Sequence, residues 1–237
     1  MSLTESREFR TLFSVKKLLF FQILALSSAF AGPVHGPTNN SPSTFEAVTG
    51  DSPDEERSVW DSFYKNKANA FGKEAIGFLK EHLHQVKKGR AFVPAMGEGR
   101  NAIYLAKHGF KVDGVDLSEV AVDRAVEAAR HQKADIKGIV ADLTTYQYPN
   151  EAYDFIVLSL FYMPNLMPKF KKTLKRGGHI MIYVKADNGK PTQQSSPDDF
   201  LVKGSDLKTA LRDFETISYK EYKDHDVEVV AILARKP

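Results

Sequence analysis

The stretch at residues 91–102, AFVPAMGEGRNA, decides the fold that we expect for this chain. An apolar run at residues 91–93 leads into a turn with Gly97 and Gly99, and a helical pattern follows at residues 101–108. Glycine has no Cβ, so the backbone can turn sharply there and a ligand can come close. The next helix would direct its free N–H groups at that ligand. The stretch therefore predicts a strand, a ligand-binding turn and a helix.

A second apolar run, at residues 112–115, ends in Asp116. A carboxylate at this place can accept hydrogen bonds from the two vicinal hydroxyls of a ribose. Strand, glycine turn, helix, strand and acid, in this order, predict the first half of a nucleotide-binding α/β domain. The alternative is an ordinary strand-to-helix turn with two incidental glycines, and the flanking strands and the acid argue against it.

The rest of the chain continues to alternate strands and helices. Strand patterns occur at residues 136–140, 153–160 and 179–184, and helical patterns occur at residues 72–86, 118–132, 167–174 and 205–212, with Ser205 as the expected cap of the last. This alternation implies a parallel sheet with helices on both faces. Alternating runs at residues 214–222 and 227–233 predict a terminal β-hairpin. The polar stretch at residues 186–204 is long enough to be a lid. His82 and His84 are expected on the surface of the helix at residues 72–86.

The N-terminal part has a different composition. The apolar run at residues 18–28 follows Lys16 and Lys17 and precedes an A-x-A sequence at residues 29–31, which is the order of a secretory signal peptide. A membrane anchor, a mitochondrial presequence and a mis-assigned start are the alternatives. Residues 32–57 are rich in Pro, Gly, Ser, Thr and Asn and predict a flexible linker. The expected division is a signal-like or anchor segment at residues 1–31, the linker at residues 32–57 and a folded domain at residues 58–237.

Composition narrows the classes of partner. The formal net charge is +3 and the pI about 8.8, yet no basic cluster stands out, so we expect no nucleic-acid partner. The chain has no cysteine, which excludes disulfides, thiolate catalysis and cysteine metal sites, and we expect no metal. We expect a small-molecule substrate, and membrane contact only through residues 18–31 if that segment is not cleaved. The sequence leaves the oligomeric state open.

Five segments, taken in order, carry a resemblance to a known family. They are GEGRNA at residues 97–102, VDGVDLS at residues 112–118, ADL at residues 141–143, YDFIV at residues 153–157 and LKRGG at residues 174–178. Over residues 57–237 the chain resembles the class I S-adenosylmethionine-dependent methyltransferases, and within them the small-molecule group that includes the tellurite-resistance methyltransferases. The resemblance implies a Rossmann-like, doubly wound α/β fold with a mainly parallel seven-stranded sheet and a C-terminal antiparallel hairpin. It also implies S-adenosylmethionine as the cofactor.

The resemblance implies roles for single residues. Asp116 would bind the ribose hydroxyls, Leu117 would pack on the adenine, and Asp142 would accept from the adenine amino group. The full set of implied cofactor-binding residues is Ala95, Met96, Gly97, Gly99, Asn101, Asp116, Leu117, Asp142, Leu143 and Ser159. Tyr162, just after the strand at residues 153–160, would position the substrate beside the transferred methyl group.

Aromatic residues are candidates for the substrate pocket. Trp60, Tyr64 and Tyr183, together with Tyr162, could wall it, because their π faces suit a cationic sulfonium. Two positions depart from the family pattern: Val93 stands where an acid is usual, and Ala95 stands at the first motif glycine. The loss of a carboxylate there implies either weaker cofactor binding or an Asp or Glu from elsewhere in the chain in its place.

These observations favour methyl transfer to a small molecule. A thiolate or a metalloid oxyanion is a soft nucleophile that needs no strong base, and no dedicated base stands out. One alternative is a non-catalytic protein that binds S-adenosylmethionine. Another is an NAD-dependent oxidoreductase, against which the lack of a second mononucleotide-binding half counts. The cofactor requirement favours a catalytic domain that faces the cytosol, whereas the N-terminal pattern is typical of export or anchoring, and this conflict stays open.

Overall fold

The computed structural model describes residues 52–187, 189 and 200–237. The expectations for residues 1–31, for the linker before residue 52 and for most of the 186–204 loop lie outside these described residues. Within the described part, no helix is both long enough and apolar enough to cross a membrane.

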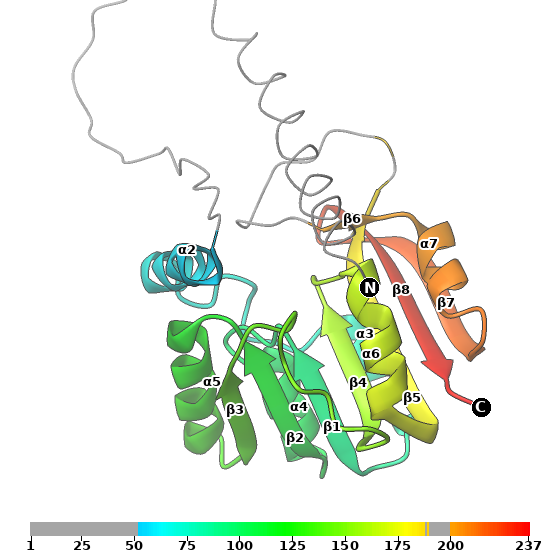
Figure 1. Ribbon diagram of the computed structural model, residues 1–237, viewed down its shortest axis with the longest axis horizontal. Coiled ribbons are helices and arrows are strands. Elements are labelled where there is room, and N and C mark those ends of the chain that lie inside the picture. The colour runs from blue at the N-terminus through cyan, green and yellow to red at the C-terminus, as the bar shows by residue number, and fades with distance from the viewer. Residues whose placement is uncertain (1–51, 188, 190–199) are drawn as a thin grey trace, which may run out of the picture. The chain divides into compact units, whose positions relative to one another are not determined.

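One mixed sheet forms the centre of the molecule (Figure 1), with the strand order β3-β2-β1-β4-β5-β8-β7 and with β6 beside β5. The strands are β1 Arg90–Pro94, β2 Lys111–Asp116, β3 Ile136–Val140, β4 Tyr153–Ser159, β5 Leu174–Ala186, β6 Leu201–Val202, β7 Glu215–Asp224 and β8 Val227–Arg235. Strands β1 to β5 are parallel, and β8 pairs antiparallel with β5 and β7. The expected doubly wound sheet with a terminal hairpin is confirmed. The short β6, parallel to β5, is an additional strand.

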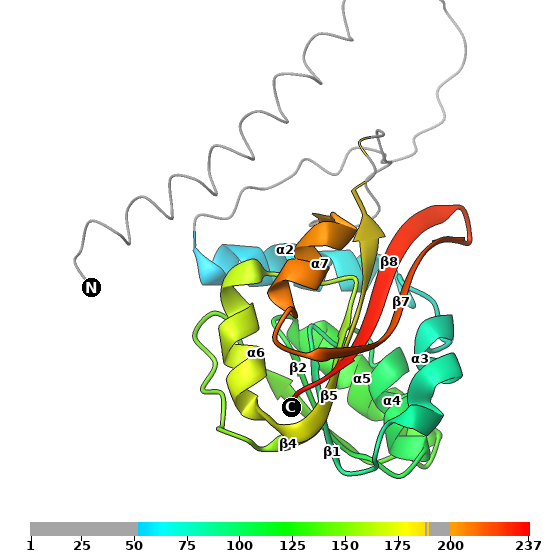
Figure 2. The ribbon, with the colours of Figure 1, turned by 90° about the vertical axis from the view of Figure 1, so that its right-hand side faces the viewer.

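Helices cover both faces of the sheet. They are α2 Pro53–Asn66, α3 Gly77–His82, η1 Leu83–Gln85, α4 Arg100–Lys107, α5 Glu119–His131, η2 Pro164–Leu166, α6 Met167–Thr173 and α7 Gly204–Ala210. Figure 2 shows α3, α4 and α5 on one face and α6 and α7 on the other, with α2 across one end. Strand β4 feeds both cores, because Phe155 and Val157 enter one cluster and Ile156 and Leu158 enter the other. A strand buried on both faces reads as a continuous apolar run, as residues 153–160 do.

Helix α2 begins inside the segment that was expected to be linker. Ser52 and Glu55 form a capping box: the Glu55 amide donates to Ser52 Oγ at 3.3 Å and the Ser52 amide donates to Glu55 Oε2 at 3.0 Å. Pro53 occupies the first turn, where a missing N–H costs nothing. These local signals start the helix at Pro53, so the linker boundary at residue 57 was wrong.

Two further expectations need correction. The helix expected at residues 72–86 is shortened to α3 and η1. His82 was expected on the surface but is buried: its Nδ1 lies 3.0 Å from the Phe78 carbonyl oxygen, and its ring packs on the Phe78 ring. His84 is exposed, as expected. Ser205 does not cap α7, because the helix begins one residue earlier and its N-cap position is Lys203.

Candidate functional site

The turn after β1 takes the left-handed backbone conformation three times. The φ angles of Ala95, Gly97 and Gly99 are 48°, 55° and 83°. A Cβ on Gly99 would lie 2.8 Å from the Cβ of Ala125, so α5 can pack this closely only against glycine. The φ of Ala95 lies in the region that glycine favours, and Ala95 stands at the position where the family pattern has glycine. The sequence prediction of a sharp glycine turn is confirmed.

Asp116 joins the end of β2 to this turn. Its Oδ2 accepts a hydrogen bond from the Gly97 amide at 2.7 Å, and its Oδ1 accepts one from the Ser118 amide at 3.0 Å. The side chain is buried, and burial raises the pKa of its carboxyl to about 6, although hydrogen bonds from the backbone amides of Ser118, Gly97 and Leu117 lower the pKa. The negative charge of Asp61 adds to the rise. A carboxylate thus lies directly beside the glycine turn.

Helix α2 crosses the carboxyl edge of the sheet and covers the turn (Figures 1 and 2). A Cβ on Gly97 would come within 2.8 Å of the Tyr64 hydroxyl, and Tyr64 is only 3% exposed. Asp61 holds the helix in place: its Oδ1 accepts from Ser118 Oγ at 2.6 Å and from the Val120 amide at 3.3 Å. The acidic side chain of α2 therefore attaches to the N-terminus of α5, where the helix dipole favours negative charge.

A second link joins α2 and the segment after it to the glycine turn. Glu98 Oε2 accepts from the Ala70 amide at 3.1 Å, and Glu98 Oε1 lies 3.2 Å from an Arg124 guanidinium nitrogen. The same nitrogen of Arg124 donates to the Tyr64 carbonyl. Val93, which stands where the family pattern has an acid, is buried in the hydrophobic core. In the described part, Asp116 is the carboxylate that accepts from the Gly97 amide.

The structure offers a test of whether the site suits the expected cofactor. Ser159 ends β4, and its buried Oγ finds no hydrogen-bond partner among the described residues. Buried hydroxyls are rarely left unpaired, so this atom is available to a polar group of a ligand. Asp142 follows β3, and its carboxylate already accepts from the amide and the hydroxyl of Thr144, both at 2.7 Å. Leu143 is buried and Leu117 half-buried beside these acids. The arrangement fits a nucleoside with an amino-acid tail.

The side chains of Met96 and Asn101 make contacts within the protein: Met96 packs over β2, and Asn101 accepts a hydrogen bond from the backbone. A Cβ on Gly114 would lie 2.1 Å from Met96 Sδ, so the methionine fills the space over β2. Asn101 Oδ1 accepts from the Ile76 amide at 3.1 Å and so anchors the start of α3. The backbone of Met96 takes part in the turn, since its carbonyl accepts from the Gly99 amide at 3.1 Å.

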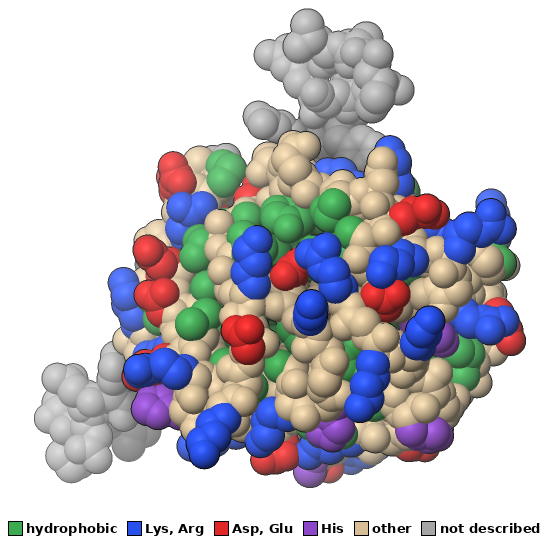
Figure 3. Space-filling model, turned by 90° about the horizontal axis from the view of Figure 1, so that it is seen from below, with side chains coloured by type: hydrophobic (Ala, Val, Ile, Leu, Met, Phe, Trp, Pro, Cys, Tyr) green, Lys and Arg blue, Asp and Glu red, His purple; other side chains and the backbone are tan. Residues whose placement is uncertain are grey.

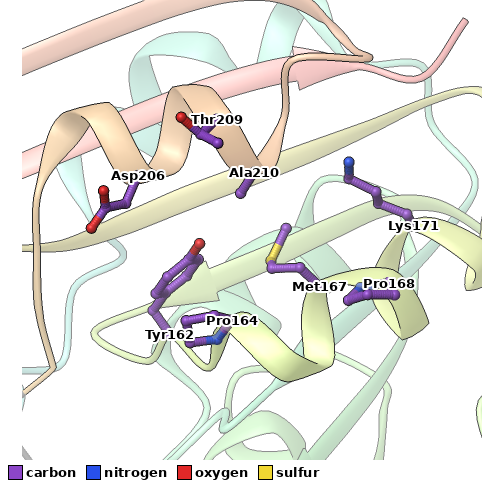
Figure 4. Close-up of a pocket in the computed structure, with 8 residues that line it drawn as sticks. All are labelled: Tyr162, Pro164, Met167, Pro168, Lys171, Asp206, Thr209 and Ala210. Atoms are coloured by element: carbon purple, nitrogen blue, oxygen red, sulfur yellow. The ribbon is translucent and has the colours of Figure 1, made fainter.

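Tyr162 lies on the other face of the sheet from α3 and α4. It lines a cavity of about 640 Å³ between α6 and α7 (Figure 4), together with Pro164, Met167, Pro168, Lys171, Asp206, Thr209 and Ala210. Its side chain points toward α7, and burial followed by the charge of Asp206 raises the pKa of its hydroxyl. None of the lining residues belongs to the glycine turn, to β2 or to α2. Its role in positioning the substrate stays a prediction.

The other aromatic candidates gather near Arg100, the first residue of α4. Trp60 stacks on Tyr64 with the ring centroids 5.9 Å apart. The Tyr183 hydroxyl donates to Asp224 Oδ2 at 2.7 Å, and the negative charge of Asp224 raises the pKa of the Arg100 guanidinium, against the larger effect of burial. Burial raises the pKa of both tyrosines, so they stay neutral.

Four residues of the site were missed in the sequence: Asp61, Glu98, Arg100 and Arg124. Glu98 and Arg100 stand inside the glycine motif, where no role of their own was assigned to them, and charged residues beside a ligand turn are a usable signal. Asp61 and Arg124 reach the turn only because α2 docks on α5, and no local pattern shows that contact.

Comparisons with known proteins show which proteins this chain resembles. A methyltransferase-domain family matches residues 94–178. The chain is 24% identical over 221 residues to TehB of Haemophilus influenzae, a probable S-adenosylmethionine-dependent methyltransferase, with 86% of this chain and 76% of TehB covered. It is 36% identical over 106 residues to phosphoethanolamine N-methyltransferase 1 of Zea mays. That match covers 41% of this chain and spans only 21% of the plant protein.

Solved structures show the same fold. The crystal structure of TehB aligns with a TM-score of 0.60 at 21% identity, covering 75% of this chain and 67% of that one. A Burkholderia thailandensis 1,6-didemethyltoxoflavin-N1-methyltransferase with bound S-adenosylhomocysteine aligns with a TM-score of 0.62 at 16% identity, covering 86% and 93%. The ordered motifs, the fold and these matches support a class I S-adenosylmethionine-dependent methyltransferase that resembles TehB.

Proposed function

We propose that the protein transfers the methyl group of S-adenosylmethionine to a small molecule, with a thiol or a metalloid oxyanion as the methylated group. The observation that carries the proposal is the cover over the glycine turn: Tyr64 on α2 closes onto Gly97, where an added Cβ would lie 2.8 Å from its hydroxyl. A turn covered in this way suits a small acceptor better than a polymer.

The chemistry around the turn supports a soft nucleophile. Four polar side chains lie in or beside the turn. They are the carboxylates of Asp116 and Glu98, the guanidinium of Arg100 and the hydroxyl of Tyr64. The pKa of the Tyr64 hydroxyl is raised by burial, so it is a poor acceptor of protons at neutral pH. A thiolate or an oxyanion arrives already ionised and needs no base.

When bound, S-adenosylmethionine would supply an electrophilic methyl group on a sulfonium sulfur, whose neutral thioether, S-adenosylhomocysteine, would be the leaving group. The residues of the chain bind and orient. Asp116 accepts from the ribose hydroxyls, Ser159 offers its buried hydroxyl to the cofactor's tail, and Tyr64 excludes water above the turn. Positioning and exclusion of water are the main contributions of a protein to such a displacement.

The first test is calorimetric titration of the full chain with S-adenosylmethionine and S-adenosylhomocysteine. We expect micromolar binding that weakens by about 100-fold in Asp116→Ala, because the ribose loses a charged acceptor worth roughly 3 kcal/mol. Asp123→Ala, which removes an exposed acid on α5, is the matched control and should bind as the wild type does.

The second step is an acceptor screen that measures S-adenosylhomocysteine formation with thiols, tellurite and selenite. Turnover of any of these supports the proposal. Tight cofactor binding without turnover of any acceptor would instead favour a non-catalytic binding protein. Binding of NAD in place of S-adenosylhomocysteine would refute the methyltransferase proposal.

A further inference from the structure

Arg100 has more hydrogen-bond donors than the described residues use. It is the first residue of α4, and its Nη1 donates to the Phe71 carbonyl in the segment between α2 and α3. Among the described residues, no carboxylate lies within ion-pair distance of its guanidinium. A guanidinium carries five N–H donors in a fixed planar fork, so Arg100 keeps donors for a ligand.

The position of Arg100 is partly shielded from water. The residue is half-buried, and burial lowers the pKa of its guanidinium, which nevertheless stays charged at neutral pH. A Cβ on Gly72 would lie 3.8 Å from its Nη1, so the α2–α3 segment covers one side of it. Desolvation of this degree strengthens the attraction of a guanidinium for an anion.

A second pair of polar groups, Tyr183 and Asp224, lies near enough to Arg100 for the charge of Asp224 to affect its guanidinium. Tyr183 comes from the carboxyl end of β5, and its hydroxyl donates at 2.7 Å to Asp224 at the end of β7. The Asp224 carboxylate raises the pKa of the Arg100 guanidinium. Figure 2 shows the β7–β8 hairpin reaching the same end of the sheet that α2 crosses. Three chain segments thus meet around one cation, next to the glycine turn.

We infer that Arg100 is a specificity-determining residue that binds a single carboxylate of the methyl acceptor, with Tyr183 and Asp224 limiting the charge that is accepted. The inference rests on the proposed methyl transfer to a small molecule. The guanidinium fork matches a carboxylate in geometry. The negative charge of Asp224 also acts on this site. Arg100 can pair with one carboxylate of the acceptor, whereas a second carboxylate would be repelled by Asp224.

The test compares two thiols that differ only in the group at the far end. 3-Mercaptopropionate carries a carboxylate, and 3-mercaptopropanol carries a neutral hydroxyl in its place. We expect the full-length protein to show a kcat/KM at least about tenfold higher for the acid, mainly through KM. This acid-to-alcohol ratio should fall to near one in Arg100→Gln and recover in part in Arg100→Lys. Arg130→Gln, an exposed arginine of α5, should keep the ratio.

Asp224→Asn supplies an independent arm. It keeps an oxygen that can accept from Tyr183 but removes the negative charge. We expect kcat/KM for mercaptosuccinate, a thiol with two carboxylates, to rise several-fold relative to 3-mercaptopropionate. Because each readout is a ratio between two acceptors, partial loss of folded protein cancels.

An acid-to-alcohol ratio near one in the wild type, or a ratio unchanged in Arg100→Gln, would overturn the inference. If neither thiol is methylated, 3-mercaptopropionate is titrated calorimetrically into the protein saturated with S-adenosylhomocysteine, and absence of binding also overturns it. Failure of the proposed function is seen separately, as absence of S-adenosylhomocysteine binding in the first titration.

Discussion

Asp116 couples cofactor binding to pH. The pKa of its carboxyl is raised to about 6, chiefly by burial, and a ribose donates its hydroxyls to the ionised form. Protonation therefore competes with the cofactor as pH falls through this value. We expect the association constant for S-adenosylhomocysteine to drop about tenfold for each pH unit below about 6 and to level off above it. Calorimetry across this range measures the profile, and a flat profile would contradict the assignment of Asp116.

Ala95 stores backbone strain. Its φ of 48° is left-handed, a conformation that costs an L-residue with a Cβ roughly 1 kcal/mol or more. Ala95→Gly should raise the free energy of unfolding by up to about 1 kcal/mol, offset in part by the greater entropy of the unfolded glycine. Urea denaturation measures the change. Ala106→Gly, inside α4, is the control and should lower the same quantity by about 1 kcal/mol or more.

At the scale of elements, α2 is the cover of the cofactor site, and its attachment depends on few contacts. Phe63, Tyr64 and Ala121 form a small cluster of their own, separate from the two cores of the sheet. The polar links are Asp61 to α5 and Arg124 to the Tyr64 carbonyl. A helix held by a satellite cluster and a few hydrogen bonds can open without disturbing the sheet.

Removal of the Asp61 link should therefore speed release of the cofactor. We expect Asp61→Ala to raise the dissociation rate of S-adenosylhomocysteine about tenfold, because a hydrogen bond to a charged group contributes roughly 1.5 kcal/mol or more. Trp60, the only tryptophan of the chain, lies in α2 and reports the opening in stopped-flow fluorescence. Asp54→Ala, at the exposed start of α2, is the control. An unchanged rate in Asp61→Ala would show that the aromatic contacts and the Arg124 link hold the helix without Asp61.

At the scale of the whole molecule, the parallel sheet brings the site together. The ends of β1, β2 and β4 meet at one edge, which places the glycine turn, Asp116 and Ser159 side by side, as ligand sites of open α/β sheets usually lie. The surface seen from below in Figure 3 carries acidic and histidine side chains among its Lys and Arg side chains.

The sequence by itself determined the strand–turn–helix order, the glycine turn and the position of Asp116. These features depend on hydrophobic periodicity and on backbone conformations that only certain residues favour, and both are local. The bond from Gly97 to Asp116, between residues 19 apart, follows from that order.

Only the tertiary structure decided the cover and the far side of the pocket. Asp61 meets Ser118 across 57 residues of chain, and Tyr183 meets Asp224 across 41. It also placed Tyr162 between α6 and α7, although the residue follows β4 directly. Contacts of this kind depend on how the helices pack and on where the β7–β8 hairpin joins the sheet. No local pattern of residues encodes that packing, because it results from the fit of whole surfaces.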